Sequence, residues 1–179
     1  MLYVFGFEQT GVAVADLYFV DPHPLPGQEG PERGVRLEVR LLERLPLKGS
    51  IYSAQPIEVG RPVWRADLLE SADGPAGSFN RTHYHPALSG WEPGNRVFDR
   101  ELSASPVEWV GSRLGDLAGL LADAGVPTSP AVERDAVALR KCVPEITTAL
   151  NRLLEGVRAG DLARAPEGGR SGSARLGWL

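Results

Sequence analysis

The sequence predicts an α+β fold, with an antiparallel sheet in the N-terminal half followed by helices. Two observations support this prediction. Apolar and charged residues alternate over 35–45, which is the period of a strand with one buried face. Two later segments begin with Ser-Pro, at Ser105 and Ser129, and continue with apolar residues at helical spacing. We therefore expect the sheet to pack against two C-terminal helices.

Further strands are expected before and after 35–45. Residues 11–21 are rich in β-branched and aromatic side chains, and the Pro- and Gly-rich segment 22–34 then forms a long loop. A strand over 51–59 contains Pro56, which favours a sheet edge or a bulge. Residues 63–86 indicate a β-hairpin whose turn is formed by an Asp-Gly-Pro stretch.

The first predicted helix spans 105–125. Ser105 is placed as its N-cap and Pro106 as its first residue, and Glu108 follows the cap by three positions. This spacing predicts a capping box, in which the serine and glutamate side chains each accept from a backbone amide. Gly125 ends the segment.

The second predicted helix spans 129–160, from Ser129 as N-cap to Gly160 as terminator. Pro144 lies near its middle. Because proline removes a backbone donor and clashes with the preceding turn, we expect a kink there.

The chain is expected to form one domain over 1–160, followed by a tail over 161–179. The tail is rich in Gly, Ser and Arg, which is typical of a flexible segment. It ends with three apolar residues, Leu176, Trp178 and Leu179, which could dock on this subunit or on a neighbour.

Composition excludes several classes of protein. The 179 residues are 42% hydrophobic and 23% charged, as in ordinary globular domains. The net charge of −4 lacks the basic excess of nucleic-acid-binding domains, so nucleic acid is disfavoured as a partner. No window approaches the roughly 20 uncharged apolar residues of a membrane span.

The composition also suggests a compartment and a source. Cys142 is the only cysteine, so one chain can form neither an internal disulfide nor a cysteine-based zinc site. The N-terminus has no basic region before its apolar residues, so we expect no signal peptide and a cytoplasmic protein. Of 19 basic residues only Lys48 and Lys141 are lysine, which suggests a high-GC bacterial genome.

The predicted hairpin over 63–86 gathers polar side chains on one face. Side chains alternate along a strand, so Arg81, His83 and His85 share a face, and Arg65 and Asp67 share one on the preceding strand. A tight turn at the Asp-Gly pair would place Asp67 opposite Arg81 and Arg65 opposite His83. A one-residue slip would bring different faces together.

This face is the candidate functional site. We expect Arg65, Arg81 and His85 to bind a small anionic ligand such as a phosphate or carboxylate. His83 is the candidate catalytic proton carrier, and Asp67 would orient a guanidinium. Three downstream residues are candidates for the rim: Arg96, Asp99 and Glu101.

Two other interpretations remain open. The polar face could be the solvated side of a two-layer sheet, in which cross-strand ion pairs need no function. The protein could also be an interaction module without catalysis, and a homodimer formed through a sheet edge or the tail is the commonest form of that. A nuclease is a weaker alternative because the chain is acidic.

A metal site is a separate possibility, because His-x-His on a strand supplies two ligands on one side. The spacing Gly77-x5-His83-x-His85 resembles the opening of the cupin motif. The resemblance covers about nine residues, and the glutamate of that motif would fall at Ser89 or Gly90. No histidine follows, so the sequence places no third ligand, and we assign neither a metal nor a cofactor.

Overall fold

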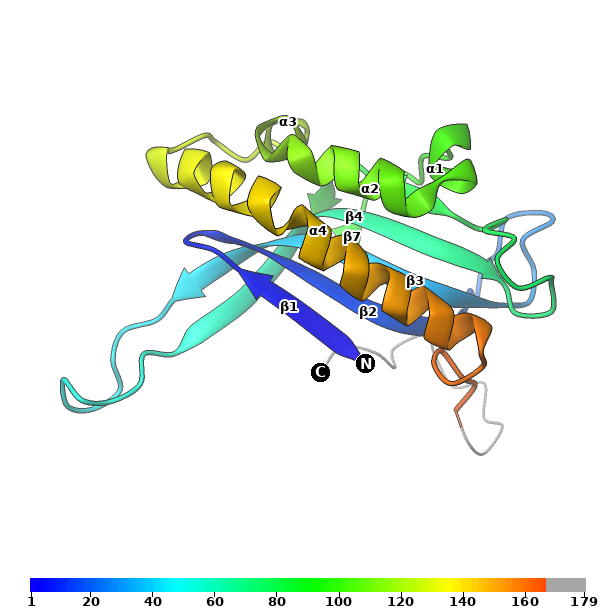
Figure 1. The fold of residues 1–179 in the computed structure, drawn as a ribbon, viewed down its shortest axis with the longest axis horizontal. Helices are drawn as coiled ribbons and strands as arrows, with labels where there is room; N and C mark the ends of the chain where they lie inside the picture. Colours follow the sequence, from blue (N-terminus) through cyan, green and yellow to red (C-terminus); the bar gives the residue numbers. More distant parts are fainter. Residues whose placement is uncertain (167–179) are drawn as a thin grey trace.

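A five-stranded antiparallel sheet forms the N-terminal half in a computed structural model, and helices cover one of its faces (Figure 1). The structure describes residues 1–166. The strands of the sheet follow one another in space as in sequence: β1 (Leu2–Gly6), β2 (Thr10–Val20), β3 (Pro31–Arg44), β4 (Ile57–Ser71) and β5 (His83–His85). The predicted α+β fold is confirmed.

The remaining elements lie after β5. A two-stranded sheet is formed by β6 (Leu88–Ser89) and β7 (Glu92–Pro93). The helices are α1 (Arg100–Ala104), α2 (Pro106–Gly115), α3 (Leu117–Asp123) and α4 (Pro130–Arg158). Within 1–166, four helices therefore replace the two that were expected.

The core lies between the sheet and the helices. Alternate residues of β2, β3 and β4 point into it, and Trp64 of β4 stacks on Trp109 of α2 with their ring centroids 6.2 Å apart. Burial of these side chains is the main force that holds the layers together. The core side chains that are fully or almost fully buried include Val14, Val35, Leu37, Leu68, Val110, Leu114, Leu139, Ile146, Leu150 and Leu153.

The strand predictions were wrong at several places: β1 was not predicted, and β3 begins at Pro31, within the predicted loop 22–34. Residues 51–56 precede β4 and form no strand, so Pro56 lies in a loop. Strand β4 is continuous from Ile57 to Ser71 and includes Pro62, opposite Arg40, where the register with β3 shifts. A bulge accommodates this proline because the ladder there does not require its missing N–H. The tip of the β3–β4 hairpin extends beyond the body of the sheet (Figure 1).

The single helix predicted over 105–125 is broken at Asp116. This side chain accepts a hydrogen bond from the Gly119 backbone N–H and starts α3. The capping box is also absent, because the Ser105 side chain makes no capping hydrogen bond. Ser105 directly follows α1, and its own N–H donates to the Glu101 carbonyl.

Helix α4 agrees with the prediction at both ends. The Ser129 hydroxyl accepts from the Val132 N–H, and the helix ends just before Gly160. It continues through Pro144, and the expected kink stays a prediction. After the helix, the Ala163 N–H donates to the Asp16 carboxylate. The predicted docking of 176–179 lies outside the described residues.

Candidate functional site

The strands β4 and β5 place the predicted polar residues on the face that points away from the helices. Arg65 and Asp67 alternate with helix-facing residues on β4, and His83 and His85 flank the helix-facing Tyr84 on β5. We call this side of β3, β4 and β5 the polar face. It consists of Glu32, Arg36, Glu38, Arg40, Arg65, Asp67, His83 and His85.

The cross-strand register differs from the predicted one by two residues. Arg65 lies opposite His85, and Asp67 lies opposite His83. The connection between the strands spans 72–82 and is not a tight turn. Because the difference is an even number, the same side chains share the face although their partners change.

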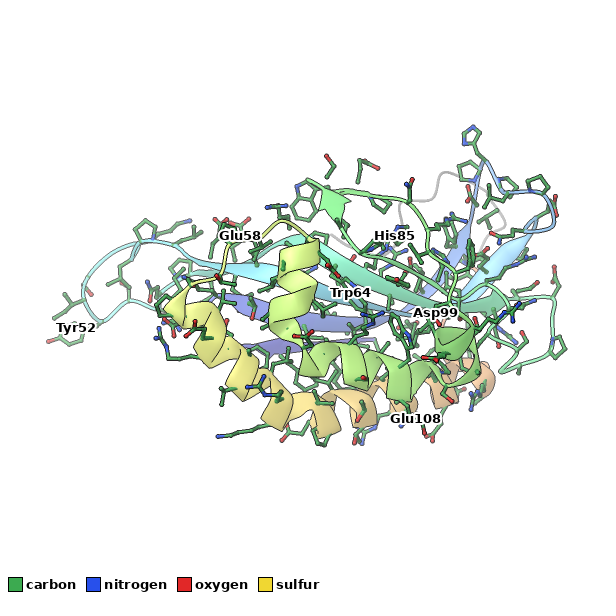
Figure 2. The ribbon with its side chains drawn as sticks, turned by 90° about the horizontal axis from the view of Figure 1, so that it is seen from above. Tyr52, Glu58, Trp64, His85, Asp99 and Glu108 are labelled. Atoms are coloured by element: carbon green, nitrogen blue, oxygen red, sulfur yellow. The ribbon has the colours of Figure 1, made fainter. Side chains whose placement is uncertain are left out.

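The polar face is buried, so it is not the solvated side of a two-layer sheet. Asp67 is 1% exposed, His83 3% and His85 1%. The segment 86–99 lies over them, and Figure 2 shows it on the side of the sheet opposite the helices, with His85 beneath it. The Phe98 ring lies 5.6 Å from the His83 ring. Burial at this level requires each polar group to have a partner.

Two guanidinium groups neutralise the buried carboxylate. Arg36 Nε donates to Asp67 Oδ1 at 2.6 Å, and Arg65 Nε lies 2.9 Å from Oδ2. Burial raises the pKa of Asp67, but Arg36, His85 and Arg65 together hold it well below its usual value. Arg36 was not among the site residues predicted from the sequence. Its role could have been found only from the register of β3 on β4, because that pairing makes Arg36 the cross-strand partner of Asp67.

Both histidines present the same nitrogen to this carboxylate. The Nδ1 of His83 lies 2.8 Å from the Arg81 carbonyl, and the Nδ1 of His85 lies 2.8 Å from the Gly94 carbonyl. A carbonyl only accepts, so each Nδ1 carries the hydrogen. The Nε2 atoms then lie 3.4 and 3.5 Å from Asp67 Oδ2. Burial lowers the pKa of His83 to about 4, against the opposing effect of Asp67.

These three side chains form a potential metal-binding set. One ligand atom from each of Asp67, His83 and His85 lies within 4.8 Å of the other two. Bonds of 2.0–2.2 Å to a tetrahedral ion place neighbouring ligand atoms roughly 3.3–3.6 Å apart. The two nitrogen-to-Oδ2 distances match that range. The hydrogen bonds from each Nδ1 to a backbone carbonyl are the usual support of metal-binding imidazoles.

Arg65 contacts two of the same three ligand atoms. Its Nη2 lies 2.9 Å from His85 Nε2, and its Nε is the atom beside Asp67 Oδ2. The guanidinium is thus the cation that balances this part of the cluster. An ion that binds Asp67 and His85 has to displace these contacts.

Arg81 does not join Arg65 as predicted. It precedes β5, and its Nη1 donates to the Gly27 carbonyl at 2.6 Å. Its Nε lies 3.9 Å from Glu32 Oε1. The predicted opposition of Arg81 and Asp67 is wrong because of the two-residue difference in register.

The three expected rim residues have separate roles. Arg96 forms an ion pair with Asp21 at 2.8 Å. This ion pair joins the segment 86–99 to the loop 21–30, which follows β2. Asp99 caps α1 by accepting from two backbone amides, one of them that of Glu101. Glu101 itself is an acidic residue in the first turn of that helix.

Comparisons with protein-family models, with curated proteins and with solved structures find no match to this chain. None of the helices within 1–166 has the length and apolar character of a membrane span. The side chains of the polar face are therefore the basis for a functional assignment.

Proposed function

We propose that the protein binds a divalent first-row transition metal at Asp67, His83 and His85. One observation carries this proposal: both Nε2 atoms converge on a single buried carboxylate oxygen, Oδ2 of Asp67. That oxygen also lies 2.9 Å from Arg65 Nε as an ion pair, without a hydrogen bond of good geometry from any residue within 1–166. Acceptor atoms that converge in a buried site favour a cation between them.

The donor set selects the class of metal. Two imidazole nitrogens and one carboxylate oxygen suit Zn²⁺, Fe²⁺, Mn²⁺ or Co²⁺, whereas Ca²⁺ and Mg²⁺ prefer oxygen donors. Three protein ligands also leave coordination positions for water or a ligand, as in catalytic metal sites. The nearby guanidinium groups of Arg36 and Arg65 lower the affinity for any cation.

The test is metal content and Co²⁺ binding of untagged protein. Wild-type protein is expected to hold one metal ion per chain and to give the visible spectrum of nitrogen-coordinated Co²⁺. His83→Gln and His85→Gln are each expected to weaken binding by about tenfold to a hundredfold or more. His23→Gln is the matched control, because His23 is the only other histidine and is exposed. Wild-type protein that binds no Co²⁺ would contradict the proposal.

A second candidate is direct binding of a small anion by Arg65 and Arg81, with His83 as proton carrier. It is favoured by the buried Nε atoms of both arginines, which face Asp67 at 2.9 Å and Glu32 at 3.9 Å but make no hydrogen bond of good geometry to any described residue. Inorganic phosphate should then bind metal-stripped protein in calorimetry, and Arg81→Gln should abolish the heat. Equal heats from the two proteins would refute this candidate.

Self-association through the open edge of β1 is the non-catalytic alternative. Strand β1 ends the sheet and pairs only with β2 among the described strands. Its Leu2 and Val4 side chains are 52% and 47% exposed. An unpaired edge is a template for a second copy of the chain, and an edge lysine blocks such pairing. Sedimentation should show a wild-type dimer and a Val4→Lys monomer, whereas a monomeric wild type would exclude this alternative.

A further inference from the structure

We propose that the metal centre takes up a phosphate-type dianion together with its metal, and that Arg65 couples the two events. This inference rests on the proposed metal site and names the ligand class of that site. It is carried by the charge balance of the cluster and by the two contacts of the Arg65 guanidinium.

The cluster carries an excess of positive charge before any metal binds. Arg36 and Arg65 both contact Asp67, so two guanidinium charges face one carboxylate and leave +1. The other two carboxylates on this face have their own arginines: Glu38 forms an ion pair with Arg40 at 2.6 Å, and Glu32 lies 3.9 Å from Arg81. A divalent ion raises the balance at Asp67 from +1 to +3. A buried excess of this size is costly unless anions enter with the ion.

Metal binding would also free the Arg65 fork. In this structure its Nη2 contacts His85 Nε2 and its Nε contacts Asp67 Oδ2, and both acceptor atoms belong to the metal-binding set. An ion that takes those atoms leaves the guanidinium without them, although its side chain is only 11% exposed. A buried guanidinium needs acceptors, and a phosphate group matches its fork with two parallel hydrogen bonds.

We place the entry of the anion at the surface hollow beside Phe98. A hollow of about 530 Å³ is lined by Phe98, Asp99, Arg100, Ser103 and Ala104. Phe98 is 51% exposed, and its ring also contacts His83. The Phe98 ring thus borders both the hollow and His83, and we expect an anion to approach the open coordination position of the metal past this side chain.

The test measures Co²⁺ affinity at fixed free Co²⁺, with and without inorganic phosphate. Phosphate is expected to raise the affinity of wild-type protein about tenfold or more, within the usual range of coupling between sites. Acetate, which has one charge, should raise it less. Coupling is reciprocal, so Co²⁺ should raise the phosphate affinity by the same factor.

Variants of Arg65 distinguish a coupling role from a structural one. Arg65→Gln should bind Co²⁺ more tightly than wild type in the absence of phosphate, because a competing cation is gone, and its gain from phosphate should fall below about twofold. Arg65→Lys keeps the charge if the glutamine variant does not fold, and should lose part of the gain because lysine cannot form the fork. Arg33→Gln, on the helix-covered face beside Glu70, should behave as wild type.

The outcomes separate this inference from the proposed metal site. Tight Co²⁺ binding that phosphate changes by less than about twofold would overturn the inference and leave the metal site standing. An equal effect of acetate would overturn the phosphate class. Phosphate that binds metal-free and Co²⁺-loaded protein equally well would overturn the coupling. No Co²⁺ binding under either condition would overturn both proposals.

Discussion

Arg65 and His85 face each other across β4 and β5, with the arginine Nη2 2.9 Å from the histidine Nε2. Arginine only donates, so the imidazole nitrogen accepts this hydrogen bond. Through the same guanidinium, Arg65 forms an ion pair with Asp67. One side chain thus contacts two of the three potential metal ligands, which makes it both the structural partner of the cluster and the competitor of a metal ion.

Asp67→Asn is expected to lower the free energy of unfolding by about 3–5 kcal/mol, measured with urea. The change removes the carboxylate that two buried guanidinium groups share, and an uncompensated buried charge is costly. Asp161→Asn is the control, since the ion pair of Asp161 with Arg164 is exposed and should contribute less than about 1 kcal/mol. Similar losses in both variants would mean that burial does not decide the effect.

Asp135→Ala is expected to lower the free energy of unfolding by about 3 kcal/mol, because the change leaves several donors without a partner. Asp135 is a buried residue of α4 that accepts hydrogen bonds from the N–H groups of Glu8, Gln9 and Thr10 and from the Thr10 hydroxyl. It thereby attaches the β1–β2 turn to the helix. Glu155→Ala, an exposed change on the same helix, should alter stability by no more than about 0.5 kcal/mol.

Gly34→Ala is expected to destabilise the protein by about 3 kcal/mol or more. A Cβ atom at Gly34 would lie 2.1 Å from the Leu68 carbonyl oxygen of the neighbouring strand. Backbone in the middle of a sheet cannot move away without breaking the ladder. Gly115→Ala meets nothing within 4 Å and should leave stability unchanged or raise it by up to about 1 kcal/mol. Thermal unfolding of the two variants provides the comparison.

The pH dependence of stability should include a contribution from Glu32. Burial raises the pKa of this carboxyl above its ordinary value of 4.5, against Arg96 and Arg81, which lower it. Between pH 4.5 and the raised pKa, the Glu32 carboxyl is therefore protonated in the folded state and ionised in the unfolded state. Stability from this group is complete below pH 4.5 and is lost as the pH rises through the raised pKa.

Glu32→Gln should therefore raise the free energy of unfolding at pH 7 by about 1 kcal/mol and have no effect in acid below the unfolded pKa. Urea unfolding of both proteins across this pH range measures the difference. A variant that is less stable than wild type at pH 7 would show that the attraction of Glu32 to Arg81 outweighs its burial.

Local sequence determined the elements whose patterns are unambiguous. Alternation over 35–45 predicts β3, and Ser129 and Gly160 mark α4, because strand periodicity and helix caps depend on neighbours in the chain. The break at Asp116 was missed, since one continuous helix and two short ones share the same apolar spacing. The capping box at Ser105 was predicted from a local four-residue pattern, which does not show that α1 occupies the preceding turn.

The candidate site also combines features that the sequence determined with features that only the tertiary structure decided. The sequence by itself determined that Arg65 and Asp67 share a face with His83 and His85, because alternation along β4 and β5 survives any even shift of register. Tertiary structure alone decided the partners: Arg36 reaches Asp67 from β3, and the long connection 72–82 pairs Arg65 with His85. It also decided burial, because Gly94 of the segment 86–99 contacts His85, and Arg81 and Arg96 hold the segment 21–30 in place, through long-range hydrogen bonds that leave no local pattern in the sequence.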